Sequence, residues 1–130
     1  MHRLTALATF AGLLMTQAAF AIDHTKDSLE TVRKNVDQKK AVIVDVRDES
    51  EWNDGHLDGA TLLPYSQIRK NVDAEAVKRK LPKGKIIYTH CKAGVRSLGS
   101  AIILEKLGYD VRPLEPGYDK LIEAGFPKAK

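Results

Sequence analysis

The chain has 130 residues, enough for one domain with a hydrophobic core and too few for two domains of ordinary size. Its formal net charge is +4, and its lysines and arginines are scattered rather than interleaved with aromatic residues, which argues against a nucleic-acid-binding face. A single cysteine excludes an internal disulfide framework.

Residues 1–21 have the pattern of a secretory signal peptide. Arg3 gives a short basic start, residues 4–20 carry no charge, and residues 19–21 form an Ala-x-Ala cleavage motif. We expect cleavage directly after this motif, export to the periplasm, and one mature domain over residues 22–130. A retained anchor is the alternative, because the apolar run just reaches the length of a membrane span. After cleavage we expect no stable membrane association.

The first part of the mature chain predicts a helix and then a strand. Apolar residues three or four positions apart favour an amphipathic helix over residues 25–36, capped by Thr25 or Asp27. Residues 41–46 are mostly β-branched, as is typical of a strand that is buried on both faces.

The rest of the chain alternates short helices and strands. Pro113 indicates that the last strand lies at the edge of a sheet or ends there, and Gly108 is expected to end the preceding helix in a left-handed conformation. Such alternation predicts an α/β fold with a mainly parallel central sheet flanked by helices on both faces. The expected helices cover residues 49–53, 73–81, 98–107 and 118–124, and the expected strands residues 60–63, 86–88 and 109–114.

The only cysteine, Cys91, follows the strand at residues 86–88 and precedes a tight turn through Gly94. Backbone N–H groups and the positive end of a helix dipole meet at such a corner, where they stabilise anions, including a thiolate. Lys92 and Arg96 add two positive charges. An inert buried cysteine is the simpler alternative. It would not need two cations and a glycine within five positions, so we favour a reactive thiol.

The loop from Cys91 to Ser97, CKAGVRS, resembles the active-site loop of the rhodanese family of sulfurtransferases. A second stretch resembles the upstream signature of this family, in the same order and with similar spacing. The likeness is greatest to small, exported, single-domain thiosulfate sulfurtransferases of the phage-shock type. It implies a rhodanese-like fold for the single domain. The residues of the second stretch are Asp45, Val46, Arg47, Glu51, Gly55, His56, Leu57, Gly59, Ala60 and Pro64.

The resemblance also implies roles for individual residues. Cys91 would be the nucleophile, would take the sulfane sulfur of thiosulfate as a persulfide, and would pass it to cyanide or a thiol. No metal or organic cofactor is called for. The residues expected around the bound anion are Lys92, Ala93, Gly94, Val95 and Arg96, and the supporting residues are Asp45, Arg47 and Ser97. For Asp45 and Arg47 we favour a structural role, and direct contact with the substrate is the alternative.

Two histidines suggest a Cys–His pair, in which a base activates the nucleophile. We expect neither to act in this way. His56 lies in a turn, and His90 precedes Cys91 on the strand, so that its side chain points away from the thiol. Trp52 and Phe126 are interpreted as packing residues. No pair of cysteine or histidine residues has the spacing of metal ligands.

The loop length bears on the rival activities. Cys91 and Arg96 enclose four residues, whereas cysteine-dependent phosphatases resemble Cys-x5-Arg, so a phosphatase or arsenate reductase is disfavoured. 3-Mercaptopyruvate is disfavoured as donor because a cationic loop suits a compact anion. A non-enzymatic alternative stays open, in which the domain carries sulfur to, or senses redox state with, one dedicated protein partner.

Overall fold

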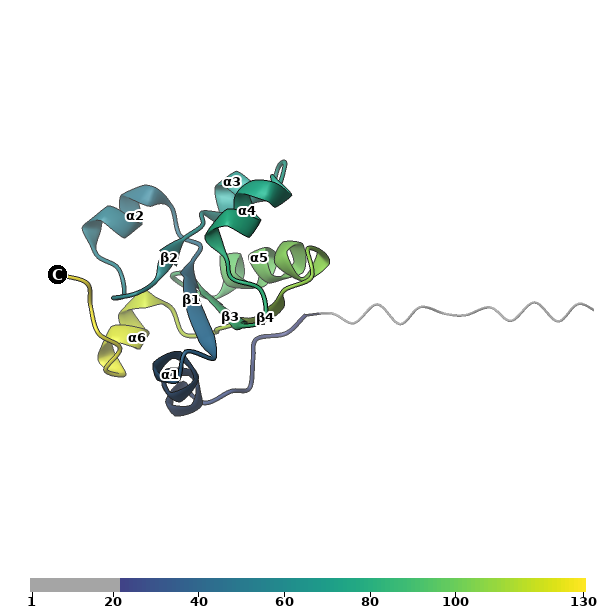
Figure 1. Ribbon diagram of the computed structural model, residues 1–130. Helices are drawn as coiled ribbons and strands as arrows, with labels where there is room; N and C mark the ends of the chain where they lie inside the picture. The colour runs from purple at the N-terminus through teal and green to yellow at the C-terminus, as the bar shows by residue number, and fades with distance from the viewer. Residues whose placement is uncertain (1–21) are drawn as a thin grey trace, which may run out of the picture.

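The computed structural model describes residues 22–130, so the predicted signal peptide lies outside the described residues (Figure 1). Helices and strands alternate as predicted. No helix in the described part is long and apolar enough to cross a membrane. In chain order the elements are α1 (Leu29–Asp37), β1 (Ala41–Asp45), α2 (Glu49–Asp54), β2 (Thr61–Leu62), α3 (Tyr65–Ile68), α4 (Ala74–Lys80), β3 (Ile86–His90), α5 (Val95–Lys106), β4 (Asp110–Pro113) and α6 (Tyr118–Glu123).

The four strands form one parallel sheet in the order β2-β1-β3-β4. The prediction of a parallel sheet is therefore confirmed, and β4, which ends at Pro113, is an edge strand. Asp45, the last residue of β1, lies opposite His90, the last residue of β3. The carboxyl ends of the two central strands are level, so the segments that follow them begin side by side.

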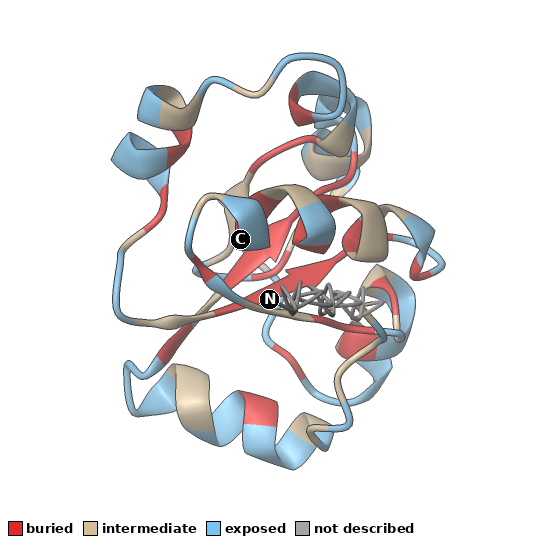
Figure 2. Ribbon diagram, turned by 90° about the vertical axis from the view of Figure 1, so that its right-hand side faces the viewer, coloured by how far each residue is buried: buried red, intermediate tan, exposed pale blue. Residues whose placement is uncertain are grey.

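Helices cover both faces of the sheet, as predicted. Helices α3, α4 and α5 lie on one face, and α1 and α6 lie on the other (Figure 1). Alternate side chains of β1 enter the two layers: Val44 packs with α4 and α5, and Ile43 packs with α1 and α6. The central strands β1 and β3 are mostly buried, and the outer faces of the helices are exposed (Figure 2). Each fully buried aliphatic side chain contributes about 1.5–3 kcal/mol by its removal from water.

Helix α1 begins later than predicted. Its first residue is Leu29, and the side chain of Ser28 caps it by accepting a backbone N–H of the first turn. The prediction of Thr25 or Asp27 as the cap is wrong. Residues 22–28 precede the helix, and we call them the N-terminal strap.

Tertiary contacts hold the N-terminal strap in place. The Thr25 N–H donates to the Pro113 carbonyl of β4 at 2.7 Å. The Asp27 carboxylate accepts the Tyr88 hydroxyl at 2.7 Å and pairs with Arg112 at 2.9 Å, and these hydrogen bonds lower the pKa of Asp27. Both residues that were expected to cap a helix therefore bind distant parts of the sheet, which local sequence does not reveal.

Two other elements differ from the sequence pattern. Helix α5 begins at Val95, three residues before the expected start, because Gly94 already has the left-handed φ of 90° at its N-cap. The short helix α3, which follows Pro64, was not predicted, since four residues are too few to show a helical period. Asp73 caps α4, and the predicted left-handed conformation of Gly108 is confirmed.

Candidate active site

The loop between β3 and α5 encloses the thiol of Cys91. Cys91 follows the last residue of β3 and is only 1 % exposed. The backbone N–H of Gly94 donates to its Sγ at 3.1 Å. Because Gly94 is also the N-cap of α5, the sulfur lies at the positive end of a twelve-residue helix. A donor N–H and a helix N-terminus both stabilise negative charge that is placed beside them.

Ser97 fixes the loop from the helix side. Its hydroxyl lies 2.8 Å from the Gly94 carbonyl oxygen and 2.9 Å from that of Leu114, just beyond β4. Its own carbonyl accepts the Thr89 hydroxyl at 3.1 Å. All these groups are buried. Ser97 thus joins the loop to two strands, as a supporting residue would.

Sequence reasoning missed a second contact that shapes the loop. A Cβ on Gly117 would stand 1.8 Å from the Lys92 carbonyl oxygen, so no other residue fits there. The next N–H, that of Tyr118, donates to the Cys91 carbonyl at 2.9 Å. The segment that starts α6 therefore presses against the Cys91 loop. In the sequence, Pro116-Gly117 indicates only a turn.

The guanidinium of Arg96 forms a salt bridge with Glu51 of α2. Its two contacts with the carboxylate measure 2.6 and 3.1 Å. The hydrogen bonds from Arg96 lower the pKa of Glu51 to about 2, and the same pairing raises the pKa of Arg96. Arg96 was expected to face the bound anion. In the structure its side chain is joined to the upstream motif, across 45 residues of sequence.

Asp45 and Arg47 form a closed pair at the end of β1. The Arg47 Nη2 lies 2.7 Å from Asp45 Oδ2, its Nε lies 3.0 Å from Oδ1, and its backbone N–H also donates to Oδ1 at 3.0 Å. Nη2 donates further to the Gly55 carbonyl at 2.8 Å, and the guanidinium lies 4.3 Å from the centre of the Tyr118 ring. Both side chains are almost fully buried. The pair links the end of β1 to Gly55 and Tyr118, and Arg47 also lines the pocket beside the Cys91 loop.

The two histidines make their polar contacts away from the sulfur. His90 is fully buried, with Nε2 3.7 Å from Asp45 Oδ2 and Nδ1 3.4 Å from the Cys91 carbonyl oxygen, and burial lowers its pKa. His56 stacks on Trp52 with ring centres 3.6 Å apart, and its Nδ1 lies 3.0 Å from the Trp52 carbonyl oxygen. Among residues 22–130, no cluster of His, Cys, Asp and Glu has the arrangement of a metal site.

A pocket of about 310 Å³ adjoins the Cys91 loop and brings the two motifs together. Lys92, which is exposed, is the residue of the Cys91 loop that lines this pocket. The complete lining is Arg47, Glu51, Asp54, Gly55, Lys92, Tyr118 and Asp119.

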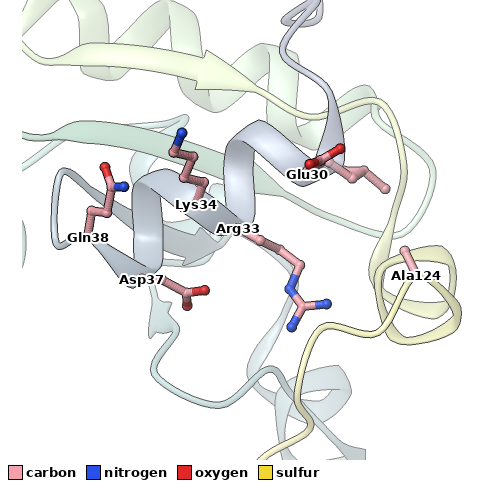
Figure 3. A pocket seen from close by; sticks show the side chains of 7 residues that line it. Glu30, Arg33, Lys34, Asp37, Gln38 and Ala124 are labelled. Carbon is pink, nitrogen blue, oxygen red and sulfur yellow. The ribbon is translucent and has the colours of Figure 1, made fainter.

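A larger hollow, of about 580 Å³, lies between α1 and the end of α6 (Figure 3). Its lining is mostly charged side chains of α1, among them Glu30, Arg33 and Asp37, with Ala124 opposite. None of its lining residues belongs to either motif, so size alone does not mark the reactive site.

Comparison with known proteins agrees with this geometry. The family described as Rhodanese-like domain matches residues 28–124. The probable adenylyltransferase/sulfurtransferase MoeZ of Mycobacterium tuberculosis is 33% identical over 101 residues, which are 77% of this chain and 25% of MoeZ. The tRNA uridine(34) hydroxylase of Protochlamydia amoebophila is 34% identical over 83 residues, 62% of this chain and 26% of the hydroxylase. The chain thus spans about a quarter of each relative.

Among solved structures, the human single-domain sulfurtransferase TSTD1 has a similar fold. The TM-score is 0.64 at 24% sequence identity, and the match covers 75% of this chain and 94% of the human chain. At this identity the likeness concerns the fold. The match extends over nearly the whole human protein.

Proposed function

The chain belongs to the rhodanese-like sulfurtransferase family, and from this premise we propose that it moves the sulfane sulfur of thiosulfate through a persulfide on Cys91. One observation carries the proposal. The Sγ of Cys91 accepts the Gly94 N–H at 3.1 Å at the start of α5, where a thiolate and a bound anion are both stabilised.

In the first step, the Cys91 thiolate attacks the outer sulfur of thiosulfate. The new bond joins Sγ to that sulfur, the S–S bond of thiosulfate breaks, and sulfite leaves with the bonding electron pair. The persulfide keeps one negative charge, so charge balances. Backbone N–H groups of residues 92–96 stabilise the charge on both sulfur species, and one such donor is worth roughly 100- to 1,000-fold in rate in comparable anion holes.

In the second step, cyanide or a thiolate attacks the outer sulfur of the persulfide. The S–S bond breaks toward Sγ, thiocyanate or an organic persulfide leaves, and the Cys91 thiolate is restored. This is a two-step covalent scheme, in which donor and acceptor bind in turn. Neither step consumes a proton or an electron from a further reagent.

The size of the loop favours a compact donor. Cys91 is 1 % exposed, and only four residues separate it from Arg96. Lys92 is the exposed cation at the adjoining pocket, whereas Arg96 shares its charge with Glu51. Thiosulfate is small and doubly charged. It therefore suits a buried thiol in a short loop beside an exposed cation better than 3-mercaptopyruvate or a phosphoryl ester does.

The test is thiocyanate formation from thiosulfate and cyanide by residues 22–130, with Cys91→Ser as the matched variant. We expect turnover by the wild type and none by Cys91→Ser, although both fold. Intact-protein mass after thiosulfate alone should show one added sulfur on the wild type only. A folded, reduced wild type that neither turns over nor gains sulfur would disprove the thiosulfate assignment.

A second candidate is a sulfur carrier for one dedicated protein partner. Val95 is 76 % exposed at the mouth of the loop, and Ile102, seven residues further along the same helix face, is 45 % exposed. Apolar groups beside the reactive loop suit a protein surface better than a small acceptor. Persulfide formation without turnover on cyanide or small thiols would favour this candidate.

We also propose that the protein is exported and matches the phage-shock type in its biology. The support is the signal-peptide pattern of residues 1–21 together with the single domain that follows. Cell fractionation and N-terminal sequencing test this proposal. A first residue of Ile22 in the periplasmic fraction is expected, and a full-length chain in the cytoplasm would contradict it.

A further inference from the structure

The N-terminal strap reaches the active-site loop through His24. The His24 Nε2 lies 2.8 Å from the Gly94 carbonyl oxygen. A carbonyl oxygen can only accept, so Nε2 carries the hydrogen. The ring also lies against the Gly94 backbone, because a Cβ placed there would be 2.9 Å from Nε2. The Rhodanese-like match begins at residue 28, so His24 lies outside it.

The strap is anchored directly after this contact. The next residue, Thr25, donates its N–H to Pro113 of β4, and Asp27 pairs with Arg112. In Figure 1 the strap runs beside β4 toward α1. The imidazole is therefore delivered to Gly94 by a fixed backbone.

The hydrogen bonds of the loop need the proton that His24 supplies. The Ser97 hydroxyl lies within 2.9 Å of two buried carbonyl oxygens, those of Gly94 and Leu114. A hydroxyl has one hydrogen to donate, so it satisfies one of them at a time. The N–H of His24 adds a second donor, and both carbonyl oxygens are then paired. A buried carbonyl left without a donor costs about 1–3 kcal/mol.

The contact with His24 also bears on a donor of the anion site. Gly94 has the left-handed φ of 90°, and its own N–H donates to the Sγ of Cys91 at 3.1 Å. His24 and Ser97 hold the Gly94 carbonyl, and so fix the orientation of the 94–95 peptide. Gly94 then keeps the conformation in which its N–H meets the sulfur.

We propose that His24 is a positioning residue for the Cys91 loop, which orients the 94–95 peptide and so stabilises the thiolate and the persulfide. The proposal rests on the proposed use of Cys91 as the nucleophile. It also assigns the N-terminal strap a part in the chemistry. His24 acts through Gly94 and does not itself touch the sulfur or the substrate.

The experiment measures the alkylation rate of Cys91 by iodoacetamide in residues 22–130, for the wild type, His24→Ala and His24→Gln. At about pH 7 the thiolate fraction limits the rate, whereas at about pH 10 an ordinary thiol is ionised. We expect His24→Ala to react about 3- to 10-fold more slowly at pH 7, the range that one lost hydrogen bond gives. We expect wild-type rates at pH 10.

The controls separate positioning from folding and access. Gln reaches about as far as His with a side-chain N–H, so His24→Gln should stay within about 2-fold of the wild type. Asp23→Ala changes the exposed neighbour and should change nothing. His24→Ala should unfold a few degrees below the wild type, as one lost buried hydrogen bond implies, and all four proteins should be folded at the assay temperature.

Three results would overturn the proposal: a wild-type rate for His24→Ala at pH 7, equal losses for Ala and Gln, or equal slowing at both pH values. The assay uses neither thiosulfate nor cyanide. A protein without sulfurtransferase activity can therefore still show the His24 effect, and an active protein can lack it, so failure of this proposal is distinct from failure of the proposed function.

Discussion

The two central strands end level with each other, yet the segments that follow them are built in opposite ways. After β3, the Sγ of Cys91 is met by a backbone N–H, and the loop holds it at a helix terminus. After β1, the carboxylate of Asp45 is fully used by Arg47. One end leaves a group free to react, and the other end is saturated by its own side chains. The difference indicates that the Asp45–Arg47 pair after β1 structurally supports the Cys91 loop after β3.

The largest effect is expected from opening the saturated end. Asp45→Ala leaves Arg47 buried without its carboxylate, and breaking a buried ion pair in this way costs about 3–5 kcal/mol. This is a large part of the roughly 5–15 kcal/mol that stabilises a domain. Urea unfolding of residues 22–130 measures the loss.

A double variant sharpens this test. In Asp45→Leu/Arg47→Met both charges are removed together, so the buried unpaired charge disappears and much of the stability should return. The free energies of unfolding of the single and double variants are compared. If Asp45→Ala has the same free energy of unfolding as the wild type, the Asp45–Arg47 pair does not support the reactive end.

A smaller effect is expected from Gly117→Ala, which should lower activity more than stability. The new Cβ would overlap the Lys92 carbonyl, so the Cys91 loop must shift. A displacement of about 1 Å at a reacting group costs on the order of 100-fold in rate. Thiosulfate turnover and persulfide mass are the measurements. Gly84→Ala is the control for backbone strain, because Gly84 has a left-handed φ of 78° but a Cβ there meets nothing within 4 Å. Equal activity of both variants would contradict the expected contact.

The features that the sequence predicted are local, and the features that it missed join distant parts of the chain. The strands, the parallel sheet and the position of Cys91 at a strand end depend on local patterns, and they were predicted. The salt bridge of Arg96 with Glu51, the close approach at Gly117 and the contact of His24 with Gly94 each join residues that are far apart in the chain. Local propensity and spacing carry no information on such contacts, so only the folded chain reveals them.

A moderate effect, dependent on pH, is expected at the link between the two motifs. Pairing with Arg96 lowers the pKa of Glu51 from 4.5 to about 2. A carboxyl whose pKa is lowered by folding stabilises the fold above its ordinary pKa, and this contribution is lost as the pH falls toward 2. Glu51→Gln should therefore lose about 1 kcal/mol at neutral pH, the upper range for a partly exposed pair.

The acid titration of stability separates this pair from others. Gln can keep the capping role at the start of α2, so Glu51→Gln changes mainly the charge. Between about pH 4.5 and 2 its free energy of unfolding should fall less steeply than that of the wild type. Glu75→Gln removes an exposed partner of Lys78 and should leave the slope unchanged. Identical slopes for all three proteins would show that the Glu51 pair does not couple the motifs.

The smallest effect is expected at the exposed edge of the reactive end, in Lys92→Gln. Lys92 lines the adjoining pocket in contact with solvent, so its attraction for a dianion is screened. We expect KM for thiosulfate to rise roughly 3-fold with kcat nearly unchanged, and the difference to vanish at about 1 M salt. Lys106→Gln, in the last turn of α5, makes the same charge change far from the loop and should leave KM unaltered. If Lys92→Gln lowers kcat instead, the lysine contacts the departing sulfite, and the reactive end depends on a side chain as well as on its backbone.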